Sequence, residues 1–242
     1  MVLRRRPVLT LTYRPKTVNS FSRAGRGSVT AVAAATSSTT TAINRLVRMP
    51  GRNDARQLLE ALRPNPAYVL SRTNDLLDAN PAGFQLLPGL AEWPARQRNT
   101  IRYTFLHPAA RALWPDWEQK ARGCVAHLHA VAGADPDAPD LAAIIGELIV
   151  KSPDFSRLWD RYEVRRMGDG EKVFRHPAVG TMSLAHESLE LTRTDGQRLV
   201  VYMAAPGTAD YDAMVLLDMA GFAGAASTPD GGSYDSGVSH TQ

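Results

Sequence analysis

The sequence predicts an α+β fold, in which helices cover one face of an antiparallel sheet. Strand-like runs occur in two groups, one near residue 67 and one after residue 163, and helical periodicity fills the chain between them. Asp195-Gly196 separates the last two strand-like runs, and this dipeptide favours a tight hairpin with antiparallel strands. Helices inserted between strands of such a sheet cover one face and leave room for a cavity between the two layers.

The first 52 residues differ from the rest of the chain in charge. They hold ten Arg and Lys and no acid, so the net charge of +4 leaves a balance of −6 for the remainder. Their Arg-, Gly-, Ser- and Thr-rich composition predicts a disordered leader over residues 1–53. An organellar transit peptide, or a start codon or upstream reading frame that is not the natural one, is an alternative explanation. A basic segment of this kind predicts only charge-driven, salt-sensitive contact with nucleic acid or phospholipid.

Residues 54–97 predict a short helix, two strands and the start of a second helix. The first helix begins at Asp54, where apolar residues recur at helical spacing, at Ala55, Leu58, Leu59 and Leu62. Two strand-like runs follow at Ala67–Leu70 and Asp75–Asp78. Asn80 and Pro81 are the residue types expected at the N-cap and first position of the next helix, with a loop after it.

The stretch that begins at Arg98 alternates cationic and bulky apolar residues up to Pro108. Arg98 and Arg102 share one side of the segment in a helix and in an extended chain alike. Either geometry predicts that the two guanidinium groups and the Asn99 amide can clamp a carboxylate. The alternative is that they cap a helix or pair with acids, such as Asp116 or Glu118.

Helices dominate the middle of the chain, and strands return after it. One long helix follows Pro115 and ends at Gly133, with an apolar face of Trp117, Ala121, Cys124, Val125 and Leu128. A second carries Leu141, Ile144, Ile145, Leu148 and Ile149, and Ser152-Pro153 restarts it with an N-cap and a proline. The later strands are predicted at Glu163–Met167, Lys172–Arg175, Thr181–Thr192 and Arg198–Ala204. Thr208 caps a final helix, which closes a domain over residues 54–220, and residues 221–242 are predicted to be a disordered tail.

Motifs for catalysis and for metal binding are absent from the sequence. It contains no glycine-rich phosphate loop, no HExxH and no GxSxG. His127 and His129 lie two apart on a predicted helix and point to different faces, so they cannot share a metal ion. The sequence therefore predicts no enzyme, no cofactor and no metal site.

Cysteine content and hydropathy predict a soluble, cytoplasmic protein. The single Cys124 excludes an intramolecular disulfide and favours a reducing compartment. The longest apolar run, residues 141–150, is about half a membrane span and is interrupted by Glu147.

His176 is a further candidate for a ligand contact. It lies beside Pro177, between two strand-like runs. A histidine in such a turn can instead satisfy a backbone group, and that alternative stays open.

Several segments, taken in order, resemble a known family. They are Pro66–Leu70, Asp75–Asn80, Arg98–Pro108, Asp116–Glu118, Ser152–Trp159, His176–Gly180 and Leu199–Tyr202. Together they resemble the C-terminal ligand-binding domain of MmyB-like transcription regulators, which are common in actinomycetes. The resemblance spans about Asp54 to Asp218. It implies a PAS-like fold, a small apolar ligand such as a fatty acid, and no catalysis.

In that family the ligand-binding domain follows an N-terminal helix-turn-helix. Residues 1–53 are too short and too rich in Ser, Thr and Gly for that module, so we expect no sequence-specific DNA binding by this chain alone.

Two functions follow as expectations. The first is a ligand-sensing domain of a transcription regulator, with Arg98, Asn99, Arg102 and His176 as the ligand-binding residues. The second is an interaction module with a self-filled core that pairs with a full-length DNA-binding relative. The expected assemblies are a homodimer or a heterodimer with a related regulator.

Overall fold

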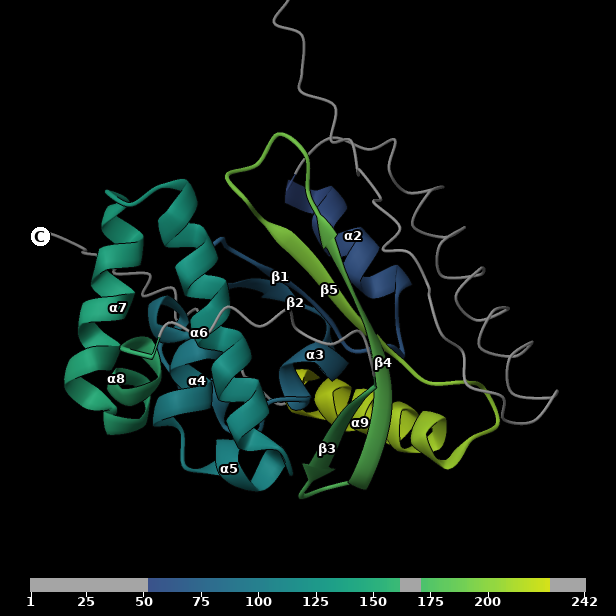
Figure 1. Cartoon of the computed structure of the whole chain (residues 1–242). Helices are drawn as coiled ribbons and strands as arrows, with labels where there is room; N and C mark the ends of the chain where they lie inside the picture. Colours follow the sequence, from purple (N-terminus) through teal and green to yellow (C-terminus); the bar gives the residue numbers. More distant parts are fainter. Residues whose placement is uncertain (1–51, 162–170, 227–242) are drawn as a thin grey trace, which may run out of the picture.

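A computed structural model of the chain describes residues 52–161 and 171–226 (Figure 1). The predicted strand Glu163–Met167 and nearly all of the predicted leader lie outside these residues. So does the end of the predicted tail, from residue 227 onward.

The described strands form one antiparallel, five-stranded sheet in the order β2-β1-β5-β4-β3. Their bounds are Ala67–Leu70 for β1, Leu76–Ala79 for β2, Lys172–His176 for β3, Gly180–Glu190 for β4 and Arg198–Met203 for β5. The last strand in sequence, β5, lies between β1 and β4, so it joins the N-terminal hairpin to the C-terminal one. The α+β prediction is thus confirmed, and so is the antiparallel pairing of the strands on either side of Asp195-Gly196.

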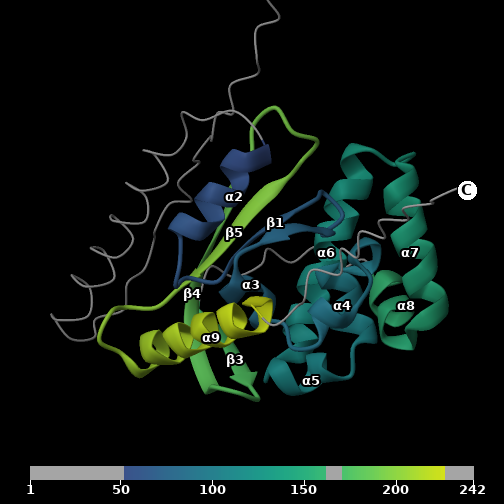
Figure 2. The same ribbon diagram turned by 180° about the vertical axis from the view of Figure 1, so that it is seen from behind.

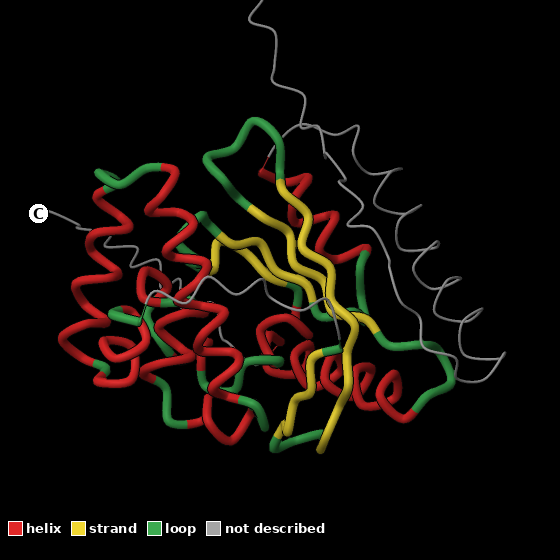
Figure 3. Tube along the Cα trace, viewed as in Figure 1, coloured by secondary structure: helices red, strands yellow, loops and turns green. Residues whose placement is uncertain are grey.

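Helices lie on both sides of this sheet (Figures 1 and 2). In the described residues before β3, the helices are α2 (Arg52–Ala61), α3 (Pro81–Gln85), α4 (Thr100–Leu106), α5 (Ala109–Leu113), α6 (Trp117–Ala134), α7 (Pro139–Lys151) and α8 (Pro153–Trp159). Two short 3-10 helices, Leu90–Glu92 and Ala95–Gln97, occupy the predicted loop, and α9 (Ala209–Ala226) follows β5. Helices α4 to α8 gather on one side of the sheet, α2 lies on the opposite side, and α9 runs beside α3 (Figures 1 to 3).

Alternation along the strands divides the core into two parts. On β5, Leu199 and Val201 face α2, whereas Val200 and Tyr202 face the helices α4 to α8. The part beneath α2 contains Leu58, Leu59, Leu62, Ala67, Val69, Leu189, Leu191, Leu199, Val201 and Met203. The larger part lies under the other helices, and its fully buried aromatic residues are Tyr103, Phe155 and Phe174.

Asn80 caps α3 as predicted, and it also joins three other segments. Its Oδ1 accepts from the Gly83 N–H at 2.8 Å and from the Ala67 N–H at 3.0 Å. Its Nδ2 donates to the Leu59 carbonyl at 3.0 Å and to the Asn65 carbonyl at 2.9 Å. Because Asn80 is fully buried, these bonds fix the end of α2 against the start of α3 and the edge of β1.

In the stretch from Arg98, the backbone is extended at Arg98 and Asn99 and helical from Thr100 to Leu106. Asn99 is the N-cap of α4, and its Oδ1 accepts from the N–H groups of Ile101 and Arg102. A separate short helix, α5, follows Pro108. The N-cap predicted at Ser152 is confirmed, with its Oγ accepting from the Phe155 N–H.

The final helix also begins as predicted, since the Thr208 hydroxyl accepts from the Tyr211 N–H. It continues through Gly221, where the tail was expected to start, to Ala226. A Cβ at Gly221 would lie 2.7 Å from the Pro81 carbonyl oxygen. This glycine therefore serves the close contact between α9 and α3 instead of ending the helix.

Candidate ligand-binding site

A cavity of about 760 Å³ lies between the sheet and the first half of α6. Its sheet side is formed by Tyr68, Leu70, Phe174, Val200 and Tyr202, and its helix side by Trp114, Lys120 and Gly123. Exposed residues such as Asp116, Glu171 and Arg175 also line it, so the cavity opens to solvent at this side. Its volume lies in the range of about 300–1,000 Å³ that is usual for small-molecule sites.

Strand pairing gives the cavity its apolar floor. Tyr68 on β1 pairs with Val200 on β5, and alternation carries Leu70 and Tyr202 to the same face. The hydroxyl groups of Tyr68 and Tyr202 lie 3.0 Å apart and share a hydrogen bond. Burial raises the pKa of Tyr68 well above its ordinary value, so this phenol is neutral. The floor is therefore aromatic and aliphatic, with an uncharged hydroxyl at Tyr68.

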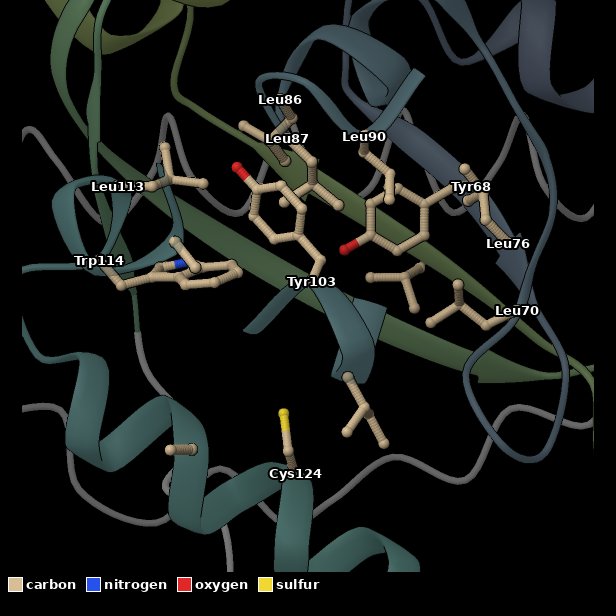
Figure 4. Close-up of a cluster of buried hydrophobic side chains, with 14 of the residues drawn as sticks. Tyr68, Leu70, Leu76, Leu86, Leu87, Leu90, Tyr103, Leu113, Trp114 and Cys124 are labelled. Carbon is tan, nitrogen blue, oxygen red and sulfur yellow. The ribbon is translucent and has the colours of Figure 1, made fainter. Parts of the chain in front are cut away.

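Side chains from several elements converge beside this floor (Figure 4). Tyr103 from α4, Trp114 from the end of α5 and Cys124 from α6 approach Tyr68 from the helix side. Cys124 is buried, as its place on the apolar face of the predicted helix indicated. Trp114 packs edge-on against Tyr103, with ring centroids 5.7 Å apart. Residues that lie far apart in the sequence thus pack together beside the cavity floor.

Arg198 brings a partly buried positive charge to the cavity. It is a lining residue, and its Nη2 donates to the Asn74 side-chain oxygen. The same Nη2 lies 3.3 Å from His127 Nε2, which in turn lies 2.8 Å from the Arg72 carbonyl oxygen. Burial lowers the pKa of Arg198 from its ordinary value, and burial together with the Arg198 charge lowers the pKa of His127 to about 4. His127 is therefore neutral near pH 7.

Arg98 and Asn99 make contacts with protein groups outside the cavity lining. Arg98 donates from Nε to the Trp93 carbonyl at 2.9 Å and from Nη2 to the Ala91 carbonyl at 2.6 Å. Asn99 is fully buried, and its amide donates to the Thr73 carbonyl. Both side chains hold loop backbone in place around the start of α4.

Arg102 joins Asn99 around Asp75. The Asn99 amide donates to Asp75 Oδ1 at 2.9 Å, and Arg102 Nη1 lies 3.3 Å from the same oxygen. Arg102 Nε also pairs with Glu147 at 2.6 Å. The acids suggested by the sequence have other partners, since Asp116 caps α6 and Glu118 pairs with Arg122.

His176 lies at the end of β3, apart from the other three predicted residues. Its Nδ1 accepts from the Ala178 N–H, so the proton is on Nε2, which donates to the Gln85 carbonyl at 2.9 Å. Burial lowers the pKa of His176 from its ordinary value. None of the four predicted ligand-binding residues is among those that line the cavity, and a ligand contact by any of them stays a prediction.

The cavity residues Tyr68, Tyr202 and Arg198 were not singled out from the sequence. Tyr68 and Tyr202 meet only because β1 pairs with β5, a register that no local pattern specifies. Arg198 did leave a signal, because it is the one cation in an otherwise apolar strand.

The described residues contain neither a metal-binding cluster nor a membrane-spanning helix. Residues 52–161 and 171–226 hold no cluster of three or more His, Cys, Asp or Glu that could bind a metal ion. His129 stacks on the Trp159 ring at 3.8 Å between centroids, and it lies apart from His127 as predicted. Within the same residues, every helix is too short or too polar to cross a membrane.

Comparison with known proteins gives one family. Its sequence profile, described as the MmyB-like transcription regulator ligand binding domain, matches residues 52–217. No curated protein matches the chain. The matched range covers more than half of the chain and includes every strand of the sheet and every residue that lines the cavity. The chain therefore belongs to the family of MmyB-like transcription regulator ligand-binding domains.

Proposed function

We propose that this domain senses a small apolar molecule, such as a fatty acid, which binds in the cavity between the sheet and α6. The observation that carries the proposal is the cavity itself, whose volume is about 760 Å³. Tyr68, Leu70, Val200 and Tyr202 give one wall a continuous apolar surface, and burial of a ligand's apolar surface against such a wall favours binding.

The topology supports a PAS-like description of this sensor. The strand order is β2-β1-β5-β4-β3, and helices α3 to α8 are all inserted between β2 and β3. Helices α4 to α8 cover one face of the sheet, and α6 and the end of α5 form the second wall of the cavity. This layering supports the PAS-like fold that the resemblance to the family implies.

A ligand in this cavity touches two separate parts of the fold. One wall belongs to strands β1, β3, β4 and β5, and the other belongs to α6 and the end of α5. A ligand therefore stabilises any state in which these two walls have a suitable separation. It changes regulator output only as far as it binds one state more tightly than another. In this proposal the movement of α6 relative to the sheet is the signal.

The alternative is an interaction module that pairs with a full-length DNA-binding relative through a self-filled core. The open cavity favours the ligand sensor over this alternative. Homodimers and heterodimers stay predictions, and the molar mass from light scattering tests for them.

The first test is extraction of the purified chain followed by mass spectrometry, together with thermal shifts on addition of long-chain acids. We expect a co-purifying lipid or an upward shift of the melting temperature. A chain that carries no lipid and shows no thermal shift contradicts the proposal.

A substitution that fills the cavity gives the second test. Val200→Phe adds a ring at the cavity floor, and we expect it to reduce ligand affinity by about tenfold or more, because it occupies ligand volume. The control is Val150→Phe, the same change at a position on α7 where the side chain is 83% exposed. Equal ligand affinity of the two variants would count against the cavity as the site.

A further inference from the structure

Arg198 differs from other partly buried arginines in its ion pairing. Arg63 pairs with Asp218 at 2.9 Å, Arg72 with Asp140 at 2.7 Å, and Arg102 with Glu147 at 2.6 Å. In the part of the chain that the structure describes, no carboxylate lies within ion-pair distance of Arg198.

The cross-strand neighbour of Arg198 does not supply the missing carboxylate. Glu190 on β4 is paired with Arg198 in the sheet register, but its side chain is exposed and forms no ion pair with the guanidinium. Burial is the largest cause of the lowered pKa of Arg198, and Glu190 only opposes it. The guanidinium thus has no compensating carboxylate among residues 52–161 and 171–226.

Its hydrogen bonds are incomplete as well. A guanidinium has five N–H donors. Asn74 Oδ1 accepts one of them, from Nη2. His127 Nε2 bonds to the Arg72 carbonyl only when it carries the proton, and it then cannot accept from Arg198. Nε of Arg198 is buried and has no hydrogen-bond partner among the described residues.

The position of Arg198 in the sheet places these N–H donors at the cavity. Arg198 lines the cavity, pairs with Leu70 on β1 and precedes Val200 by two residues, so its side chain is on the same face as the apolar floor. A buried charge without a counter-charge is costly, whereas a carboxylate can take two parallel hydrogen bonds from one guanidinium.

We infer that Arg198 is the anion-binding residue of the cavity, and that the ligand is an amphiphile with a carboxylate at one end. The carboxylate pairs with the guanidinium beside Asn74. The apolar part extends along Tyr68, Val200 and Tyr202. The inference rests on the proposed function and adds to it the residue that selects the carboxylate of the ligand.

Two ligands of equal chain length test the inference in the full chain. Decanoic acid and 1-decanol differ in their head group, and isothermal titration at pH 7.5 gives the affinity of each. We expect the acid to bind about tenfold or more tightly than the alcohol, because a charge-assisted pair replaces a hydroxyl contact. For Arg198→Met we expect 1-decanol still to bind, and decanoic acid to bind with about the same affinity as 1-decanol. Arg96→Met, which removes the same charge from an exposed position outside the cavity, should keep the preference.

The outcomes separate the inference from the proposed function. Equal affinity of the wild-type chain for the two ligands overturns the role of Arg198 and leaves an apolar ligand site in place. Retention of the acid preference by Arg198→Met also overturns it. If neither ligand binds, the proposed function fails and the inference fails with it. The wild-type comparison needs no variant, so it decides the matter even if Arg198→Met does not fold.

Discussion

The variant Asn80→Ser tests whether Asn80 only caps α3 or also acts as a clamp, that is, holds the end of α2 and the edge of β1 against α3. Serine is about as good an N-cap as asparagine, so its hydroxyl can still accept from the Gly83 N–H. It has no amide to reach the carbonyls of Leu59 and Asn65, and it cannot accept from the Ala67 N–H at the same time. If Asn80 were a cap alone, Asn80→Ser would leave stability nearly unchanged.

The contacts of Asn80 predict a much larger effect. The Leu59 carbonyl keeps a hydrogen bond from the Leu62 N–H at 3.3 Å. The groups that lose their hydrogen-bond partner are therefore mainly the Ala67 N–H and the Asn65 carbonyl. A buried polar group left without a partner costs about 1–3 kcal/mol. We therefore expect Asn80→Ser to lower the free energy of unfolding by about 2–4 kcal/mol.

Urea denaturation followed by circular dichroism measures this difference as a shift of the midpoint at an unchanged slope. Ser152→Ala is the control, because its hydroxyl only caps α8 through the Phe155 N–H, and its loss should cost about 1 kcal/mol. If Asn80→Ser is within about 0.5 kcal/mol of the wild type, the clamp role is refuted.

Two further predictions concern Arg102 and Gly221. Arg102→Gln should lower the free energy of unfolding by about 1–2 kcal/mol, because it breaks partly buried ion pairs to Glu147 and Asp75. The affinity of this variant for decanoic acid should stay within about twofold of the wild type, and a larger loss in titration would restore the sequence-based role of Arg102 as a ligand contact. Gly221→Ala should destabilise the chain by about 1–3 kcal/mol, since the new Cβ would meet the Pro81 carbonyl. Gly146→Ala on α7, where no atom lies within 4 Å of the new Cβ, should instead stabilise by about 0.5–1 kcal/mol, and thermal melts of both variants check the contrast.

Local chemistry made most elements of this fold predictable from the sequence. Asn80, Ser152 and Thr208 each accept a hydrogen bond from the first turn of a helix, and this depends on neighbours within three residues. Asp195-Gly196 likewise indicates its hairpin through local backbone preference.

The cavity could not be predicted in the same way, because long-range pairing assembles it. Arg98 and Asn99 are prominent in the sequence, but their side chains bond to loop backbone near α4. Tyr68 and Arg198 look ordinary in the sequence, and they share the cavity wall only through the β1–β5 register. A single sequence contains no direct information on that register.

The central position of β5 has a consequence for the order in which the chain folds. The β1–β2 hairpin is synthesised well over a hundred residues before β5, which pairs with the second edge of β1. Until residues 198–203 arrive, β1 therefore presents an unpaired edge, which is a site for intermolecular strand addition. A ribosome-bound chain that stops before β5 should thus aggregate more readily than the complete chain, and ligand binding would report that the last strand is in place.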